Sequence, residues 1–153
     1  MSNCVVEAGS SSGNNYAAGG RLDGGLVTHT IFRKNVCVSG MGNWQGQHGA
    51  VLELAGSSRA ENCLLADNPP SGSVYLILLG GSSVMRNCTI ADTGLKSTNE
   101  YCKAFTALRI TSADATVLNT VIAGVTNMVD GAPCPPTGTV ANFLNGADRK
   151  SVV

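Results

Sequence analysis

Apolar and polar positions along the chain alternate with a period of two, and this alternation predicts β-strands. Inward-type residues occupy every second position in Cys63–Leu65 and Cys88–Ile90, and a further small or apolar residue precedes each segment, at Ala60 and Met85. No long segment shows the 3.6-residue period of an amphipathic helix. The pattern therefore predicts an all-β chain built from short strands.

One short phrase recurs along the chain, in which Asn or His is followed by Cys or Thr and then by aliphatic or aromatic residues. The Cys or Thr positions are separated by 26, 33, 25 and 32 residues. Such a spacing is typical of a repeat protein with loop insertions in alternate copies. The phrases are Asn3–Val6, His29–Phe32, Asn62–Leu65, Asn87–Ile90 and Asn119–Ile122, with their anchors at Cys4, Thr30, Cys63, Cys88 and Thr120.

These repeats predict a solenoid of about five coils, in which equivalent residues of successive coils stack into ladders. The Asn interrupts the alternation and tolerates the left-handed backbone conformation, so we expect it at a corner between two strands. The Cys or Thr that follows it should face the interior. His29 takes the place of Asn in one copy of the corner.

A second phrase lies upstream of the anchor, where Leu52–Ser58 aligns with Ile77–Ser83. Together with the N-C-x-[LIV] phrases and the Gly-Ser turns, it resembles the pectate-lyase-like right-handed β-helix superfamily over roughly Ser2–Val125. The resemblance is greatest to the secreted repeat proteins and the polymorphic outer-membrane-protein type. It implies a right-handed parallel β-helix and an extracellular or bacterial cell-surface location. It says little of function, because this fold carries lyases, hydrolases, adhesins and spacers.

The charge balance and the hydropathy argue against two kinds of partner, nucleic acid and a membrane span. Ten Lys plus Arg balance ten Asp plus Glu, so no basic surface for nucleic acid is expected. The longest clear apolar run, Val74–Leu79, is too short to span a membrane, and Met1–Ser12 lacks the form of an export signal.

The cysteines beyond the ladder suggest one disulfide. Cys102 and Cys134 each lie 14 residues after their anchor, so they should face one another on adjacent coils within bridging distance. The alternative is two unrelated loop cysteines in a reducing compartment. Cys37 has no evident partner, and the ladder cysteines are expected to be inert small hydrophobic residues.

Two aspartates offer a possible metal site. Asp67 and Asp92 each lie four residues past their anchor, where stacked carboxylates bind calcium or act as an acid–base pair. Both also fit plain turns, and Lys34 at the matching place of an earlier coil would offset their charge. No other cofactor is indicated.

The segment Ser39–Gly49 has the composition of a binding loop. Trp44 offers a flat face for stacking on a sugar, and Gln47 and His48 offer hydrogen bonds. Tyr101, in a second long insertion, would flank the same face. These residues favour a carbohydrate or a host or cell-surface ligand, whereas the alternative is an ordinary loop packed by its Trp.

Enzymatic motifs of the β-helix superfamily are not evident. Gln47-His48-Gly49 is not the Gly-His-Gly of polygalacturonase-type sites, and Arg21, Arg86 and Arg109 have no acidic partner that the sequence identifies. We therefore expect a non-catalytic segment of a secreted or cell-surface protein, acting as a stalk, an adhesion surface or a glycan-contacting surface. The alternative is part of a polysaccharide lyase or glycoside hydrolase, which requires acids, or Arg with acids, clustered on one face.

The last six residues, Asp148–Val153, do not fit the repeat. They match one reading frame of a common sequencing adapter, which reads Asp-Arg-Lys-Ser-Val-Val before a stop codon. We therefore expect residues 1–147 to be an open-ended β-helix fragment and residues 148–153 to be a non-native tail.

Overall fold

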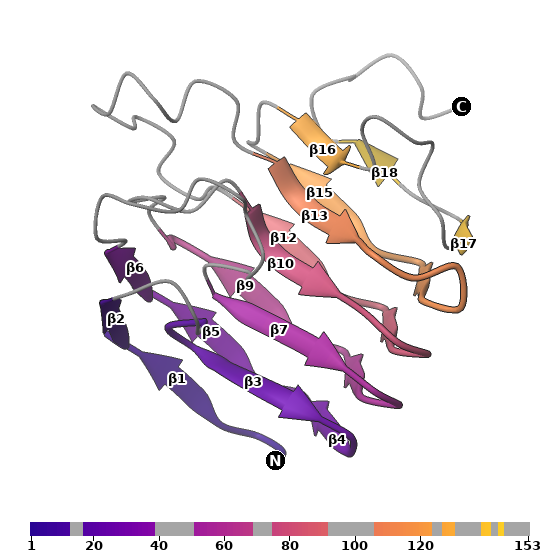
Figure 1. Cartoon of the computed structure of the whole chain (residues 1–153). Coiled ribbons are helices and arrows are strands. Elements are labelled where there is room, and N and C mark those ends of the chain that lie inside the picture. The colour runs from indigo at the N-terminus through magenta and orange to yellow at the C-terminus, as the bar shows by residue number, and fades with distance from the viewer. Residues whose placement is uncertain are drawn as a thin grey trace.

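The computed structural model describes residues 1–12, 17–38, 51–68, 75–91, 106–123, 127–130, 139–141 and 144–145. Every regular element in these ranges is a β-strand, and all strand pairs are parallel (Figure 1). The expectation of an all-β chain with parallel, in-register strands is confirmed. No helix among the described residues is long and apolar enough to cross a bilayer.

Three parallel sheets contain most of the strands, and we call them sheets I, II and III. Sheet I contains β3 (Gly20–Asp23), β7 (Leu52–Ala55), β10 (Tyr75–Leu79), β13 (Thr106–Ile110) and β16 (Asn127–Asp130). Sheet II contains β4 (Leu26–Thr28), β8 (Arg59–Glu61), β11 (Val84–Arg86), β14 (Thr116–Leu118) and β17 (Thr139–Ala141). Sheet III contains β1 (Val5–Glu7), β5 (Ile31–Arg33), β9 (Leu64–Ala66), β12 (Thr89–Ala91), β15 (Val121–Ala123) and β18 (Leu144–Asn145). A short fourth sheet pairs β2 (Ser10–Ser12) with β6 (Val36–Val38).

The chain visits the three sheets in a fixed order. It runs through sheet I, then II, then III, and returns to sheet I one strand further along, as in β7, β8, β9 and then β10. We call one such passage a circuit. Stacked circuits of this kind are consistent with a parallel β-helix.

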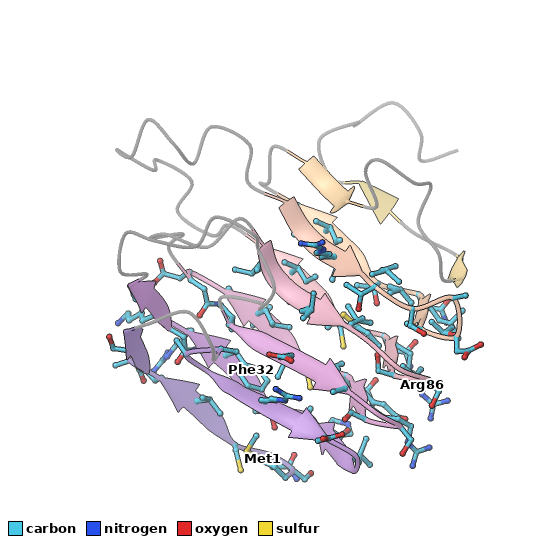
Figure 2. The ribbon with its side chains drawn as sticks, in the orientation of Figure 1. Met1, Phe32 and Arg86 are labelled. Carbon is cyan, nitrogen blue, oxygen red and sulfur yellow. The ribbon has the colours of Figure 1, made fainter. Side chains whose placement is uncertain are left out.

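Aliphatic ladders fill the space between the sheets. In sheets II and III the middle residue of each three-residue strand whose side chains the structure describes points inward, because successive side chains of a strand alternate between its faces. These middle residues pair in register and are fully buried, except for the partly buried Val6 at the first strand of sheet III. They are Val27, Ala60, Met85 and Val117 in sheet II, and Val6, Phe32, Leu65, Ile90 and Ile122 in sheet III. Phe32 lies between the sheets in Figure 2, among the buried residues of the core.

A left-handed corner joins sheet II to sheet III wherever the structure describes the connecting residues. Asn62 and Asn87 lie there with φ angles of 53°, and His29 takes the same conformation with φ of 50°. Asn119 repeats the corner, and its Nδ2 donates to Asn87 Oδ1 at 3.3 Å. The chain can turn here within two residues, because Asn and His enter the left-handed region more readily than most residues.

A second left-handed corner follows sheet III. Ala8, Lys34 and Asp67 have φ angles of 56°, 54° and 53°. Directly after the last two corner residues, Asn35 and Asn68 are fully buried. Their amides are hydrogen-bonded to one another between circuits, and these buried bonds stabilise the corner.

Candidate functional site

Most of the residues that the sequence suggests for binding lie outside the described ranges. Trp44, Gln47, His48 and Tyr101 belong to this set, as do the expected disulfide partners Cys102 and Cys134. Asp92 and the expected non-native tail, residues 148–153, also lie outside. The proposals about these residues therefore remain predictions.

Asp67, the described half of the possible calcium site, lies at the second corner. Its side chain is exposed, its φ is 53°, and its carbonyl accepts the backbone N–H of Lys34 at 2.8 Å. No group of three or more His, Cys, Asp or Glu within the described part of the chain is arranged to hold a metal ion. These observations give Asp67 a role in the turn.

Asn35 and Asn68 form a buried amide ladder that sequence reasoning missed. Asn35 Oδ1 accepts the Gly9 N–H at 3.0 Å, and Asn68 Oδ1 accepts the Asn35 N–H at 3.0 Å. The amide Nδ2 groups donate to Val6 O at 3.0 Å and to Phe32 O at 2.9 Å. The signal was present, because both residues lie five positions after their anchors, Thr30 and Cys63.

The Cys and Thr anchors make one repeated hydrogen bond. Each side chain donates to the carbonyl two residues before it, as Thr30 Oγ1 does to Thr28 O at 2.9 Å and Cys88 Sγ to Arg86 O at 3.3 Å. The same bond occurs at Cys4, Cys63 and Thr120, with donor–acceptor distances of 3.1, 3.3 and 3.0 Å. Thiol and hydroxyl are therefore interchangeable at this position as local donors.

Cys63 and Cys88 are consecutive members of this ladder and carry free thiols. When Cys63 is ionised it accepts a hydrogen bond from the neighbouring Cys88, and this lowers the pKa of Cys63 to about 7, although burial opposes the effect. Donation of that hydrogen bond, together with burial, raises the pKa of Cys88. The pair therefore combines one thiol that ionises readily with one that keeps its proton.

Ion pairs connect circuits on the outer faces of sheets II and III. Arg86 Nη2 lies 2.9 Å from Glu61 Oε2, and Arg33 Nη2 lies 2.8 Å from Glu7 Oε2. Arg86 lies at the outside of the molecule in Figure 2. Lys34 Nζ adds a contact to Glu7 at 3.5 Å. Hydrogen bonds from Arg33 and charge from both cations hold the pKa of Glu7 below its ordinary value.

A row of charged residues crosses the outer face of sheet I. Arg21 Nη1 lies 3.5 Å from Glu53 Oε1, and Glu53 is only 5% exposed although it points away from the core leucines beside it. The strand register continues this row through Leu78 and Arg109 to the backbone position of Asp130. The row places Arg21, Glu53 and Arg109, from three circuits, on one face of the sheet.

These pairs supply acidic partners that the sequence alone does not identify for Arg21 and Arg86. Arg21 pairs with Glu53 and Arg86 with Glu61, and Arg109 is also engaged. The partners were not evident because they lie 32 and 25 residues away in sequence and meet only when circuits stack in register.

No protein-family model, curated protein or solved structure matches this chain significantly.

Proposed function

We propose that this chain is a non-catalytic segment of a secreted or cell-surface protein, where it serves as a stalk, an adhesion surface or a glycan-contacting surface. In this proposal the stacked circuits are about five coils of a right-handed β-helix of the pectate-lyase-like type. The ligand would be a carbohydrate or another group on a host or cell surface.

The main support for the proposal is that three glutamates form ion pairs between neighbouring circuits. Glu7, Glu53 and Glu61 each pair with a cation of a neighbouring circuit, at 2.8, 3.5 and 2.9 Å. The hydrogen bond from Arg33 and the charges of Arg33 and Lys34 lower the pKa of Glu7, which makes that carboxylate a poor proton donor. These three acids therefore serve the joining of circuits, which suits a scaffold.

A polysaccharide lyase or glycoside hydrolase is the second candidate, and the outer row of sheet I is the observation that favours it. Arg21, Glu53 and Arg109 share that face in register. Arginine beside acids is the combination that an enzyme acting on acidic sugars would need to bind its substrate and to move a proton.

Polysaccharide turnover separates the two candidates. The purified chain is incubated with pectate, with neutral plant polysaccharides and with bacterial surface glycans, each with and without calcium. Ultraviolet absorbance reports unsaturated lyase products, and a reducing-end assay reports hydrolysis. The scaffold proposal expects no product above that of the Glu53→Gln variant. Product release that Glu53→Gln or Arg109→Gln abolishes would favour the enzyme instead.

Glycan binding tests the positive part of the proposal. On an array of surface polysaccharides, we expect the chain to bind at least one class of glycan. Trp44→Ala should lose that binding, because a stacked aromatic face contributes much of the contact with a sugar. Gln47→Ala and His48→Ala should weaken it. Equal melting temperatures of the variants serve as the control, and unchanged binding by Trp44→Ala would exclude the loop as the contact surface.

A further inference from the structure

The anchors Cys4, Thr30, Cys63, Cys88 and Thr120 stack as an inner ladder, and this ladder brings two cysteines to neighbouring positions. Cys63 and Cys88 directly precede the hydrogen-bonded strands β9 and β12, and the Thr89 N–H donates to the Cys63 carbonyl at 2.9 Å. Thr30 precedes Cys63 in the ladder and Thr120 follows Cys88. Cys4 is thereby separated from the pair by Thr30, so Cys63 and Cys88 are the adjacent thiols of the described ladder.

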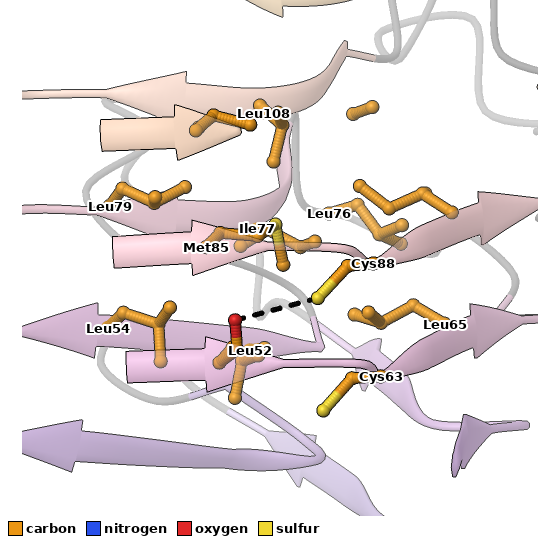
Figure 3. Close-up of a cluster of buried hydrophobic side chains, with 14 of the residues drawn as sticks. Leu52, Leu54, Cys63, Leu65, Leu76, Ile77, Leu79, Met85, Cys88 and Leu108 are labelled. Atoms are coloured by element: carbon orange, nitrogen blue, oxygen red, sulfur yellow. Dashed lines mark hydrogen bonds between the residues drawn. The ribbon is translucent and has the colours of Figure 1, made fainter. Parts of the chain in front are cut away.

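The spacing of the two residues suits a covalent link. Neighbouring strands lie about 4.8 Å apart, and disulfides join Cα atoms separated by roughly 4.4–6.8 Å. Both side chains point into the core from the same side, as Figure 3 shows. The sulfur of Cys88 already leans toward the circuit of Cys63, since it lies 3.6 Å from the carbonyl of Ala60 in that circuit.

The surroundings give the two thiols different roles. Cys63 is 3% exposed and Cys88 is 1% exposed, so only a small reagent reaches them without unfolding. Cys88 stabilises the ionised form of Cys63 by donating a hydrogen bond to it, so the pKa of Cys63 is lowered and Cys63 is the sulfur that ionises first. Cys88 keeps its proton and lies beside it, in the position of a resolving thiol.

We propose that Cys63 and Cys88 are a peroxide-reactive pair that closes an interior disulfide between two circuits. The Cys63 thiolate attacks one oxygen of hydrogen peroxide, the O–O bond breaks, and Cys63 becomes a sulfenic acid as hydroxide leaves. The Cys88 sulfur then attacks the Cys63 sulfur, so that the S–O bond breaks and the S–S bond forms. The departing oxygen leaves as water with the Cys88 proton, and the first hydroxide takes the proton that Cys63 had released. Two thiols and one peroxide thus give one disulfide and two waters.

Threonine substitutions test the pair without removing the ladder hydrogen bond. Thr30 and Thr120 occupy the same ladder and donate the same bond, so Cys63→Thr and Cys88→Thr are expected to fold. Cys4→Thr is the matched control, because it removes a ladder thiol that has no neighbouring cysteine in the described ladder. Melting temperatures of the reduced variants check that each is folded.

The experiment uses the full chain, reduced, freed of reductant and treated with hydrogen peroxide. Remaining thiols are blocked in denaturant, and tryptic peptides are analysed by mass spectrometry. Trypsin leaves each of the six cysteines on its own peptide, with Cys63 on residues 60–86 and Cys88 on residues 87–96. We expect these two peptides to appear joined, two hydrogens lighter, and to separate on reduction. The link should persist in Cys4→Thr and be absent in Cys63→Thr and Cys88→Thr.

The order of the steps makes a second prediction. Cys88→Thr should accumulate sulfenic acid on Cys63, which a dimedone-type probe labels, whereas Cys63→Thr should leave Cys88 unlabelled. The rate of closure should rise with pH through about 7, where Cys63 ionises. The proposal is wrong if both thiols stay free under peroxide in the folded chain, or if the pair links only after denaturation. Preferential linkage of either cysteine to another partner would also contradict it.

Discussion

Single donor groups decide which residues the inner ladder accepts. Each described anchor donates to the carbonyl two residues earlier, whether it carries sulfur, as in Cys63, or oxygen, as in Thr120. The bond is local, so it does not depend on the neighbouring circuit. The position requires a small side chain with one hydrogen-bond donor. Cys and Thr both meet this requirement, which explains why they replace one another along the ladder.

Ser58 and Ser83 are buried and directly precede strands of sheet II, and they are expected to respond oppositely to substitution by alanine. Ser58 Oγ accepts the Gly24 N–H at 2.8 Å, and the carbonyls of Leu22 and Ala55 lie within reach of its hydroxyl hydrogen at 2.9 and 2.5 Å. Ser83 Oγ is buried without a hydrogen-bond partner in the described structure. Ser58→Ala should lower the free energy of unfolding by about 1–2 kcal/mol. Ser83→Ala should leave it unchanged or raise it by up to about 1 kcal/mol, because an unsatisfied hydroxyl is removed.

Urea unfolding of the two variants measures this difference. Ala115 occupies the equivalent place in the next circuit and is fully buried, so alanine fits the site sterically. A loss at Ser83 as large as that at Ser58 would show that the Ser83 hydroxyl is bonded in solution.

At the scale of elements, the two corners of a circuit use asparagine for different reasons. Asn62 is exposed and contributes its backbone conformation, with φ of 53°. Asn35 is buried and contributes its amide, which bonds to Gly9, Val6 and Asn68. Asn62→Gly should therefore change the free energy of unfolding by less than about 1 kcal/mol, since glycine adopts the left-handed region freely.

Asn35→Ala should lower the free energy of unfolding by about 2–4 kcal/mol. It leaves the Gly9 N–H and the Val6 carbonyl without the bonds that the amide supplied, and buried polar groups without partners are strongly destabilising. Chemical denaturation with Asn62→Gly as the matched variant measures the contrast. Similar losses at both corners would contradict the distinction.

The turn between sheets I and II packs closely against the next circuit. Gly81 has φ of 60°, and a Cβ there would lie 2.6 Å from the carbonyl oxygen of Gly56. Gly24, with φ of 93°, has no atom within 4 Å of such a Cβ. Gly24→Ala should cost about 1–2 kcal/mol of stability for the left-handed conformation alone. Gly81→Ala should cost at least about 2 kcal/mol more, because backbone must move apart.

Thermal and urea unfolding of both alanine variants test this prediction. The Gly24 variant controls for the conformational penalty, so the difference between the two reports the contact between circuits. Equal losses would mean that the turns separate without resistance.

At the scale of the whole molecule, ion pairs between circuits make stability depend on pH. The hydrogen bond from Arg33, with the charges of Arg33 and Lys34, lowers the pKa of Glu7 in the folded state. A lowered folded-state pKa means that the contribution is present above the ordinary carboxyl value, near 4.5, and is lost as pH falls through the folded value. Glu7→Gln should therefore melt below the unsubstituted chain at pH 6, and the difference should vanish near pH 3.

Melting temperatures across this range, at low salt, provide the measurement. Arg33→Gln should reproduce the loss at pH 6, and high salt should reduce it, because Glu7 is exposed and its pair is screened. A difference that persists unchanged at pH 3 would assign the effect of Glu7 to something other than its charge.

The sequence by itself determined the strands, their parallel stacking and the left-handed corner. Alternation with period two and an Asn or His at a constant place in each repeat are local properties, and residues close in sequence express them through backbone sterics and side-chain direction. The equivalence of Asn62 and Asn87, or of Leu65 and Ile90, therefore follows from the order of residues alone.

Only the tertiary structure decided which groups meet between circuits. The pairing of Glu53 with Arg21, its near-complete burial, the contacts of Asn35 with Asn68 and the isolation of the Ser83 hydroxyl all join or separate residues far apart in the chain. Such contacts depend on loop lengths and on sub-ångström packing between strands. A repeat phrase identifies equivalent positions, but it does not state whether their side chains bond, ionise or remain unsatisfied once they are stacked.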